Sequence, residues 1–190
     1  QSGDVSPADM TSFSAYSGAD VQSMTGEDVR SLMAESGIWT ALRQRPFDRV
    51  PPTSASCAAV FVTATNSNPL AGSLVDICSG QEDLLQTGLS AISKITDGDT
   101  FFCVGPDWTL DVSKTGVRTE VFSGPHPSGN VGTHIHTLCS AHRNRTVFHI
   151  GVQDIIALGH LVKTGELMVD RVVTLAGPAV TEGKMMRSRI

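Results

Sequence analysis

The sequence predicts an α/β fold with an open, largely parallel, Rossmann-like sheet and helices on both faces. Five short apolar runs rich in β-branched residues are typical of buried strands, and they lie at 58–64, 100–104, 118–122, 146–150 and 171–176. Segments with helical periodicity separate these runs, and such alternation indicates βαβ units. Because βαβ crossovers are right-handed, the helices should cover both faces of the sheet.

The helices are placed by their start and stop signals. Thr25 is a candidate N-cap, since its hydroxyl can accept a backbone hydrogen bond, and acidic residues follow it in the first turn. The apolar stripe then runs to Trp39 or Leu42, so we expect this helix to end before Pro46. Further helices are expected at 81–95, 130–138 and 153–163, the last one ended by Gly165.

The composition suggests one domain with a linker at each end. Residues 1–24 are rich in Ser, Gly, Asp and Ala, with only Phe13 and Tyr16 as large anchors, which predicts a linker or a remnant of a preceding domain. The α/β domain is expected over 25–180, and the basic segment 181–190 should open the next linker. The chain begins with Gln1 and carries no signal-peptide pattern, so we interpret it as an internal fragment.

Charge and cysteine spacing exclude several classes of protein. A net charge of −5 argues against a nucleic-acid-binding surface, which needs clustered Lys and Arg. The cysteines, at 57, 78, 103 and 139, form no C-x-x-C pair, so a zinc ribbon or a local iron–sulfur motif is excluded. We therefore expect reduced and mostly buried thiols. Arg43, Arg45 and Arg49 form a local basic cluster, which is either a solvated rim or a contact for an anion or a partner.

The candidate site is the stretch S-G-P-H-P-S-G-N-V-G-T-H-I-H at 123–136. Dense glycine and proline indicate a backbone path that is fixed for a purpose. The stretch follows the third predicted strand, at the carboxyl edge where ligands bind in open α/β sheets. The candidate residues of this quinone or interface loop are Gly124, His126, Gly129, Gly132, His134 and His136.

Several chemistries can be tested against this loop. Gly124 and Gly129 have the spacing of a P-loop, but Asn130 and Val131 replace its Lys-Ser/Thr pair, which excludes a nucleoside triphosphate site. No G-x-G-x-x-G or G-x-S-x-G occurs in the chain. His134 and His136 could share a metal ion only on an extended segment, since two helical positions diverge by roughly 200°. The histidines therefore either bond the loop to the sheet or hold and protonate a quinone carbonyl.

Five blocks of sequence carry a resemblance to a known family. They are E-S-G-I-W-T-A-L-R-Q-R-P-F at 35–47, F-V-T-A-T-N-S-N-P-L at 61–70, the 123–136 loop, and H-I-G-V-Q-D-I-I-A-L-G-H-L-V-K-T-G-E-L at 149–167, followed by R-V-V-T-L-A-G-P at 171–178. Together they resemble the A subunit of the bacterial sodium-translocating NADH:quinone oxidoreductase. The resemblance implies the middle part of a peripheral subunit on the cytoplasmic face of the inner membrane. Its partners would be the other subunits, including those in the membrane, and ubiquinone.

The family is also similar to the flavin-bearing subunit of respiratory complex I, in which a glycine-rich loop holds the flavin. Here Gly37 is followed by the bulky residues Ile38, Trp39 and Thr40, so the resemblance implies a redox scaffold without bound flavin, metal or iron–sulfur cluster. NADH and ubiquinone would then be substrates of the parent complex. Two functions stay open: a part of the route of electrons to quinone, or a cofactor-free docking module that holds neighbouring subunits.

Overall fold

The computed structural model describes residues 11–13 and 21–189. Most of the linker expected over 1–24, with Tyr16, lies outside these residues. Within them, the Phe13 amide donates to the Gly165 carbonyl at 2.8 Å, and Met24 is buried in the main core.

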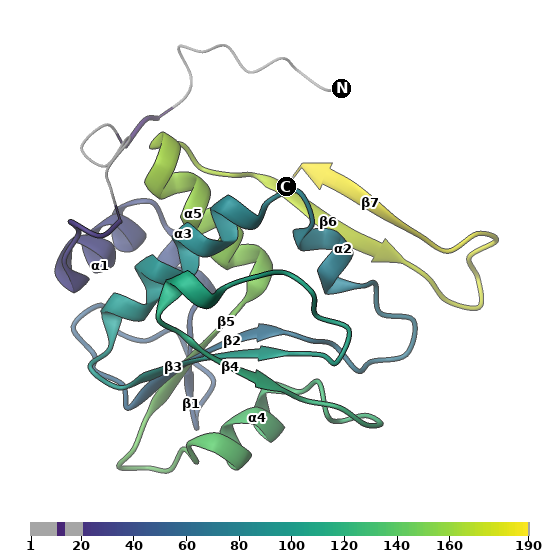
Figure 1. Ribbon diagram of the computed structural model, residues 1–190, viewed down its shortest axis with the longest axis horizontal. Helices are drawn as coiled ribbons and strands as arrows, with labels where there is room; N and C mark the ends of the chain where they lie inside the picture. Colours follow the sequence, from purple (N-terminus) through teal and green to yellow (C-terminus); the bar gives the residue numbers. More distant parts are fainter. Residues whose placement is uncertain (1–10, 14–20, 190) are drawn as a thin grey trace.

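Four strands of the central sheet are parallel, which confirms the predicted fold class. The sheet has the order β1-β5-β2-β3-β4, with only β1 antiparallel, and a separate hairpin holds β6 and β7 (Figure 1). The strands are β1 Arg43–Arg45, β2 Ala59–Ala64, β3 Asp99–Val104, β4 Arg118–Val121, β5 Val147–Gly151, β6 Asp170–Leu175 and β7 Lys184–Arg189. The α-helices are α1 Gly26–Glu35, α2 Leu74–Cys78, α3 Glu82–Ile92, α4 Val131–Leu138 and α5 Val152–Thr164. Short 3-10 turns occur at Ile38–Ala41, Ser93–Ile95 and Ser113–Thr115.

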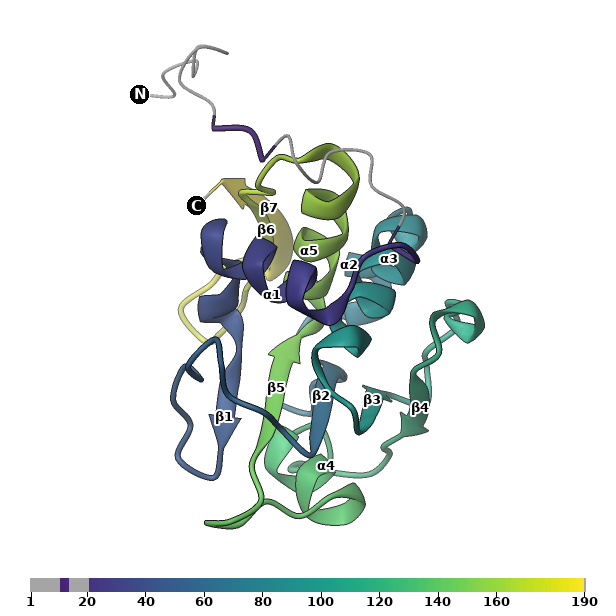
Figure 2. The same ribbon diagram turned by 90° about the vertical axis from the view of Figure 1, so that its left-hand side faces the viewer.

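Helices cover both faces of this sheet, as the sequence predicts. α1, α3 and α5 lie on one face and α4 on the other (Figures 1 and 2). Side chains of β2 alternate accordingly: Val60 and Val62 enter the larger core under α3 and α5, while Phe61 enters the smaller core under α4. β2 is therefore apolar on both sides because both sides are covered.

The chain reverses direction across the sheet between β2 and β5. It runs from β2 through β3 to β4, and then returns to place β5 on the other side of β2. In open α/β sheets, such a switch point at the carboxyl ends of the strands is where ligands bind. The loops that follow β2 and β4 both lie at this edge.

The first helix is shorter than the sequence predicts. Thr25 caps α1 as expected: Asp28 N donates to its hydroxyl at 3.2 Å, and the Thr25 amide donates to the Asp28 carboxylate at 2.8 Å. The helix ends at Glu35, however, because Gly37 has φ 82°, in the left-handed region that stops a helix. Residues Ile38–Ala41 then form a 3-10 turn, and the chain continues into the edge strand β1, which was not predicted from the sequence.

The fifth predicted strand forms but does not join the central sheet. β6 pairs with β7 instead, and so residues 184–189 form a strand where we expected the start of a linker. The side chain of Gln153 in α5 explains why β6 lies outside the central sheet. Its Nε2 donates to the Val172 carbonyl at 3.0 Å, and its Oε1 accepts from the Val172 amide at 2.9 Å. These bonds attach β6 to the helix layer, away from the edges of the sheet.

The four cysteines are free thiols, and Cys78, Cys103 and Cys139 are buried as predicted, whereas Cys57 is half-buried. Burial raises the pKa of the Cys78 and Cys103 thiols to about 12. Of the helices in the described part of the chain, none has the length and apolar character needed to cross a membrane.

Candidate functional site

The loop between β4 and α4 follows a fixed path at the carboxyl edge of the sheet. Its first residue, Phe122, donates its amide to the Val104 carbonyl at 2.8 Å, which extends the β3–β4 pairing by one bond. The chain then turns at Gly124, whose φ of 112° favours glycine. The Ser128 hydroxyl donates to the Gly124 carbonyl at 2.8 Å and closes the turn.

A single serine from the neighbouring loop fixes the middle of this segment. Ser67 lies three residues after β2, and its Oγ accepts from the Gly129 amide at 2.8 Å. The same oxygen lies 3.2 Å from His126 Nδ1. The hydroxyl can accept two hydrogen bonds and donate one, so the tautomer of His126 decides the direction of this second bond. We call these two bonds the Ser67 clasp.

Gly129 is required for the clasp because the two loops approach closely. A Cβ at this position would lie 2.3 Å from Ser67 N and 2.9 Å from the Asn66 carbonyl carbon. Both of these atoms belong to the backbone, so no side-chain movement would relieve the contact. The glycine therefore brings the loop against the end of β2.

His134 is a buried structural residue of the site. Its Nε2 lies 2.9 Å from the Ser128 carbonyl oxygen, which only accepts, so Nε2 carries the hydrogen. The ring packs on Phe122 with centroids 4.1 Å apart, and its Nδ1 has no hydrogen-bond partner among the described residues. Burial lowers the pKa of His134, so the imidazole is neutral near pH 7.

His136 and Gly132 lie on the opposite side of α4 from His134. His136 is exposed, whereas His134 is fully buried, as two positions apart on a helix require. Gly132 is one helical turn before His136, and the Arg45 guanidinium would lie 4.0 Å from a Cβ there. Within the described residues, no group of three or more His, Cys, Asp or Glu side chains is placed to hold a metal ion.

A second polar cluster lies on the same side of the sheet, at β1 and β5. Arg43 pairs with His149 in the sheet, and His149 Nε2 lies 3.2 Å from the Asp48 carboxylate. This hydrogen bond lowers the pKa of Asp48, and burial lowers the pKa of His149. At the start of α5, burial raises the pKa of Asp154. Arg171 donates to the Asp154 carboxylate at 3.0 Å, and this ion pair acts in the opposite direction and lowers the pKa.

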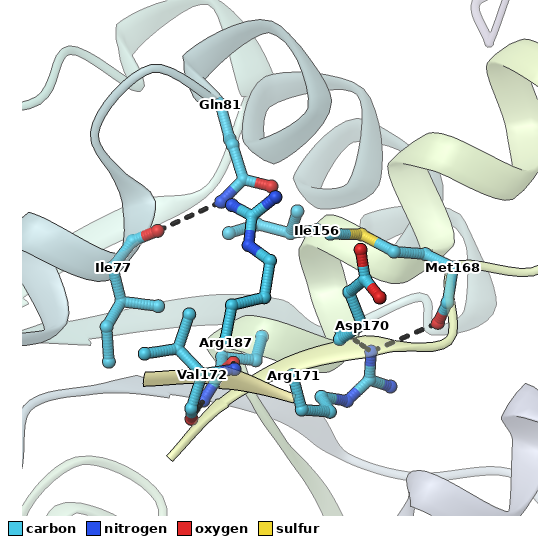
Figure 3. A pocket seen from close by; sticks show the side chains of 9 residues that line it. Ile77, Gln81, Ile156, Met168, Asp170, Arg171, Val172 and Arg187 are labelled. Atoms are coloured by element: carbon cyan, nitrogen blue, oxygen red, sulfur yellow. Dashed lines mark hydrogen bonds between the residues drawn. The ribbon is translucent and has the colours of Figure 1, made fainter. Parts of the chain in front are cut away.

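Two hollows differ in what they could hold. The first, of about 260 Å³, lies at the carboxyl edge and is lined by polar groups of Thr65, Asn66, Ser73 and Asp107. The second, of about 10 Å³, lies between α2, α5 and β6. In it, Gln81 donates to the Ile77 carbonyl at 2.9 Å and Arg171 to the Met168 carbonyl at 3.2 Å (Figure 3). This space fits about one water molecule and no organic ligand.

The structure places the six predicted residues in two groups. Gly124, His126, Gly129 and His134 are tied together by Ser67 and Ser128, while Gly132 and His136 lie on the outer side of α4. The roles of Ser67, of Ser128 as the partner of His134, and of Phe122 were not predicted from the sequence. Ser67 lies in a turn after a buried strand, which is a position where a site residue can be expected. Its contact with the 123–136 loop, however, could be predicted only from the pairing of β2 with its neighbours.

Fold and site together define an α/β scaffold domain with a fixed, histidine-bearing loop at the carboxyl edge of its sheet. Residues 24–167 match the family model described as the NqrA second alpha/beta domain. The chain therefore belongs to this domain family, and the resemblance seen in its sequence is confirmed.

Curated relatives support the same membership. The chain is 39% identical over 180 residues to a Shewanella amazonensis protein, covering 95% of this chain and 40% of the relative. A Saccharophagus degradans protein is 39% identical over 188 residues, and a Vibrio campbellii protein is 37% identical over 185 residues. These alignments cover 98% and 97% of this chain and 42% of each relative. All three are named as the A subunit of Na(+)-translocating NADH-quinone reductase, and the chain spans about two fifths of their length.

Proposed function

We propose that this domain serves electron transfer from NADH to quinone as a docking module of a sodium-translocating complex, and that it carries no redox group of its own. The observation that supports this proposal is the use of the loop's polar groups. His126 and His134 bond to Ser67 and Ser128 inside the domain, so they hold the loop in place. The proposed partners are the other subunits of the complex, on the cytoplasmic face of the membrane.

A direct contact with quinone is the second candidate, and one observation favours it. The exposed His136 imidazole has no hydrogen-bond partner in the part of the chain that the structure describes. An imidazole without a partner can form a hydrogen bond to a quinone carbonyl and transfer a proton to it. In this case the outer side of α4 forms one wall of a pocket that a neighbouring subunit completes.

Replacing His136 separates the two candidates. Its side chain is exposed, so His136→Ala should assemble normally. For a docking module, NADH:quinone turnover per assembled complex should stay within about twofold of the parent. For a quinone contact that donates a proton, turnover should fall by more than about tenfold. His142→Ala, at an exposed histidine in another turn, is the matched control. Normal turnover by complexes that lack this domain would contradict both candidates.

A further inference from the structure

The turn that follows β1 has a rigid backbone although its side chains face solvent. Gln44 N donates to the Arg49 carbonyl at 2.7 Å, and Arg49 N donates to the Gln44 carbonyl at 3.3 Å. Asp48 has φ 52° and is held by His149 of β5 at 3.2 Å. After the turn, the buried Trp39 indole donates to the Pro51 carbonyl at 2.7 Å. The turn is therefore fixed at both ends and in its middle.

This rigid turn presents apolar side chains to solvent. Phe47 is 64% exposed and Val50 is 42% exposed, and Pro46 beside them is exposed as well. The turn lies next to β1, at the lower left of Figure 2. Three apolar side chains are thus exposed together on one rigid turn, and apolar groups clustered in this way with polar residues beside them are typical of interaction sites. We call residues 45–50 the Phe47 turn.

Arg45 and Arg49 flank Phe47 in the sequence, in a chain whose net charge is −5. Arg45 lies 3.6 Å from Asp48, and these two charges offset each other. Arg49 is exposed, and its guanidinium has no partner among the described residues. Arg43 donates to the Leu42 carbonyl at 3.0 Å, and its charge acts on the carboxylates of Asp48 and Asp154. Because Arg45 pairs with Val147, the basic segment that contains Arg143 lies at the same end of β5.

We propose that the Phe47 turn is a docking surface for an acidic protein surface of the complex, with Phe47 entering an apolar pocket and Arg49 pairing with a carboxylate at the rim of that pocket. This inference rests on the proposed docking function and names its contact surface. Aromatic residues and arginine are the types enriched at the energetic centre of protein interfaces. A preformed turn also reduces the entropy lost on binding.

The same composition fits an anionic lipid surface less well. Recognition of anionic lipids generally uses four to eight clustered Lys or Arg side chains together with a larger apolar face. The Phe47 turn has one aromatic ring and an acidic residue, Asp48, fixed at its centre by His149. A fixed mixture of charges gives specificity for one partner geometry, which a fluid lipid surface does not offer.

Photo-cross-linking in the assembled complex tests this surface. p-Benzoylphenylalanine replaces Phe47, and in a second preparation it replaces Leu70, which is 67% exposed on another loop. After irradiation of native membranes, position 47 should cross-link to a segment of a neighbouring subunit that carries Asp or Glu. Leu70 is the control for an exposed apolar residue. A lipid adduct at 47, or no more protein cross-linking at 47 than at 70, would overturn the proposal.

Charge reversal sharpens the result. With the cross-linker at 47, Arg49→Glu should lower the cross-linked fraction about fivefold, since it opposes an acidic partner without touching the backbone bonds of the turn. Lys114→Glu, an exposed reversal on a distant 3-10 turn, should leave the fraction unchanged. An equal effect of both reversals would overturn the proposal.

If the complex assembles and position 47 cross-links to no protein, the proposed docking surface is wrong while the docking function stands. If the domain is absent from the purified complex, the docking function itself fails.

Discussion

The two faces of the central sheet are covered in different ways. On one face, three helices pack on a large apolar core, and α3 and α5 touch backbone to backbone at Gly88 and Gly159. On the other face, one short helix covers a smaller core, and polar bonds from Ser67 and Ser128 hold its leading loop. The first face therefore supplies most of the stability. The second leaves polar and apolar groups exposed to solvent.

The largest expected effect is a glycine substitution that breaks the tightly packed face. A Cβ at Gly159 would lie 1.9 Å from the Leu84 carbonyl oxygen, so Gly159→Ala must separate α3 from α5. We expect a loss of about 3 kcal/mol in the free energy of unfolding, measured by chemical denaturation. Gly132→Ala is the matched control on the other face, because its Cβ would meet nothing closer than 4.0 Å. The control should gain up to about 1 kcal/mol from helix propensity. Equal losses in the two variants would contradict the comparison.

A smaller loss is expected at the loop. Gly129→Ala would place a Cβ 2.3 Å from Ser67 N, but a surface loop moves more easily than a packed helix pair. We expect the free energy of unfolding to fall by about 2 kcal/mol. Hydrogen exchange should show faster exchange in the loop and unchanged exchange in α3 and α5. Faster exchange throughout the domain would mean that the two faces are not independent.

The pH dependence of stability tests the buried imidazole. Burial lowers the pKa of His134, so as pH falls below about 6.5 the unfolded state takes up a proton before the folded state does. Stability is therefore full above this pH and declines as pH falls towards the folded-state pKa. His134→Gln can still donate to the Ser128 carbonyl, and it should reduce the drop in melting temperature between pH 7.5 and 5.5. The drop should persist in part, because burial also lowers the pKa of His149. His142→Gln should keep the full drop in melting temperature. If His142→Gln reduced the drop and His134→Gln did not, the assignment of the pH dependence to His134 would be refuted.

The smallest expected effect is the loss of the clasp. Ser67→Ala removes the acceptor of Gly129 N and the hydrogen-bond partner of His126 Nδ1, and the His126 side of the clasp is solvent-exposed. We expect a loss of about 1 kcal/mol in the free energy of unfolding. Ser54→Ala, at an exposed serine, is the control and should change nothing. A loss as large as that of Gly159→Ala would show that the loop carries the fold.

Sequence patterns predicted the parts of the fold that depend on local periodicity. β2, β3 and β5 are apolar runs covered on both faces, and the stop at Gly165 is a left-handed C-cap with φ 73°. β1 was missed because its three residues, Arg-Gln-Arg, form a strand only through pairing with β5. The position of β6 was wrong because the side chain of Gln153, not a strand period, decides where its backbone bonds go.

For the candidate site, the position of the loop could be predicted from the sequence, but the residues that hold the loop in place could not. Glycine and histidine content located the loop, and the helical geometry of α4 correctly separated His134 from His136. Ser67 and Phe122 were missed, since their roles come from the order of β2, β3 and β4 in the sheet. Contacts between segments distant in sequence leave no local pattern. The functional role of the six loop residues stays a prediction.

Hydrogen exchange of this domain, alone and within the purified complex, tests the central claim most directly. If one face builds the fold and the other docks, the complex should protect amides in the Phe47 turn and in the 123–136 loop, while α3 and α5 exchange at the same rates in both samples. Protection confined to α3 and α5, with the two loops unchanged, would contradict the account.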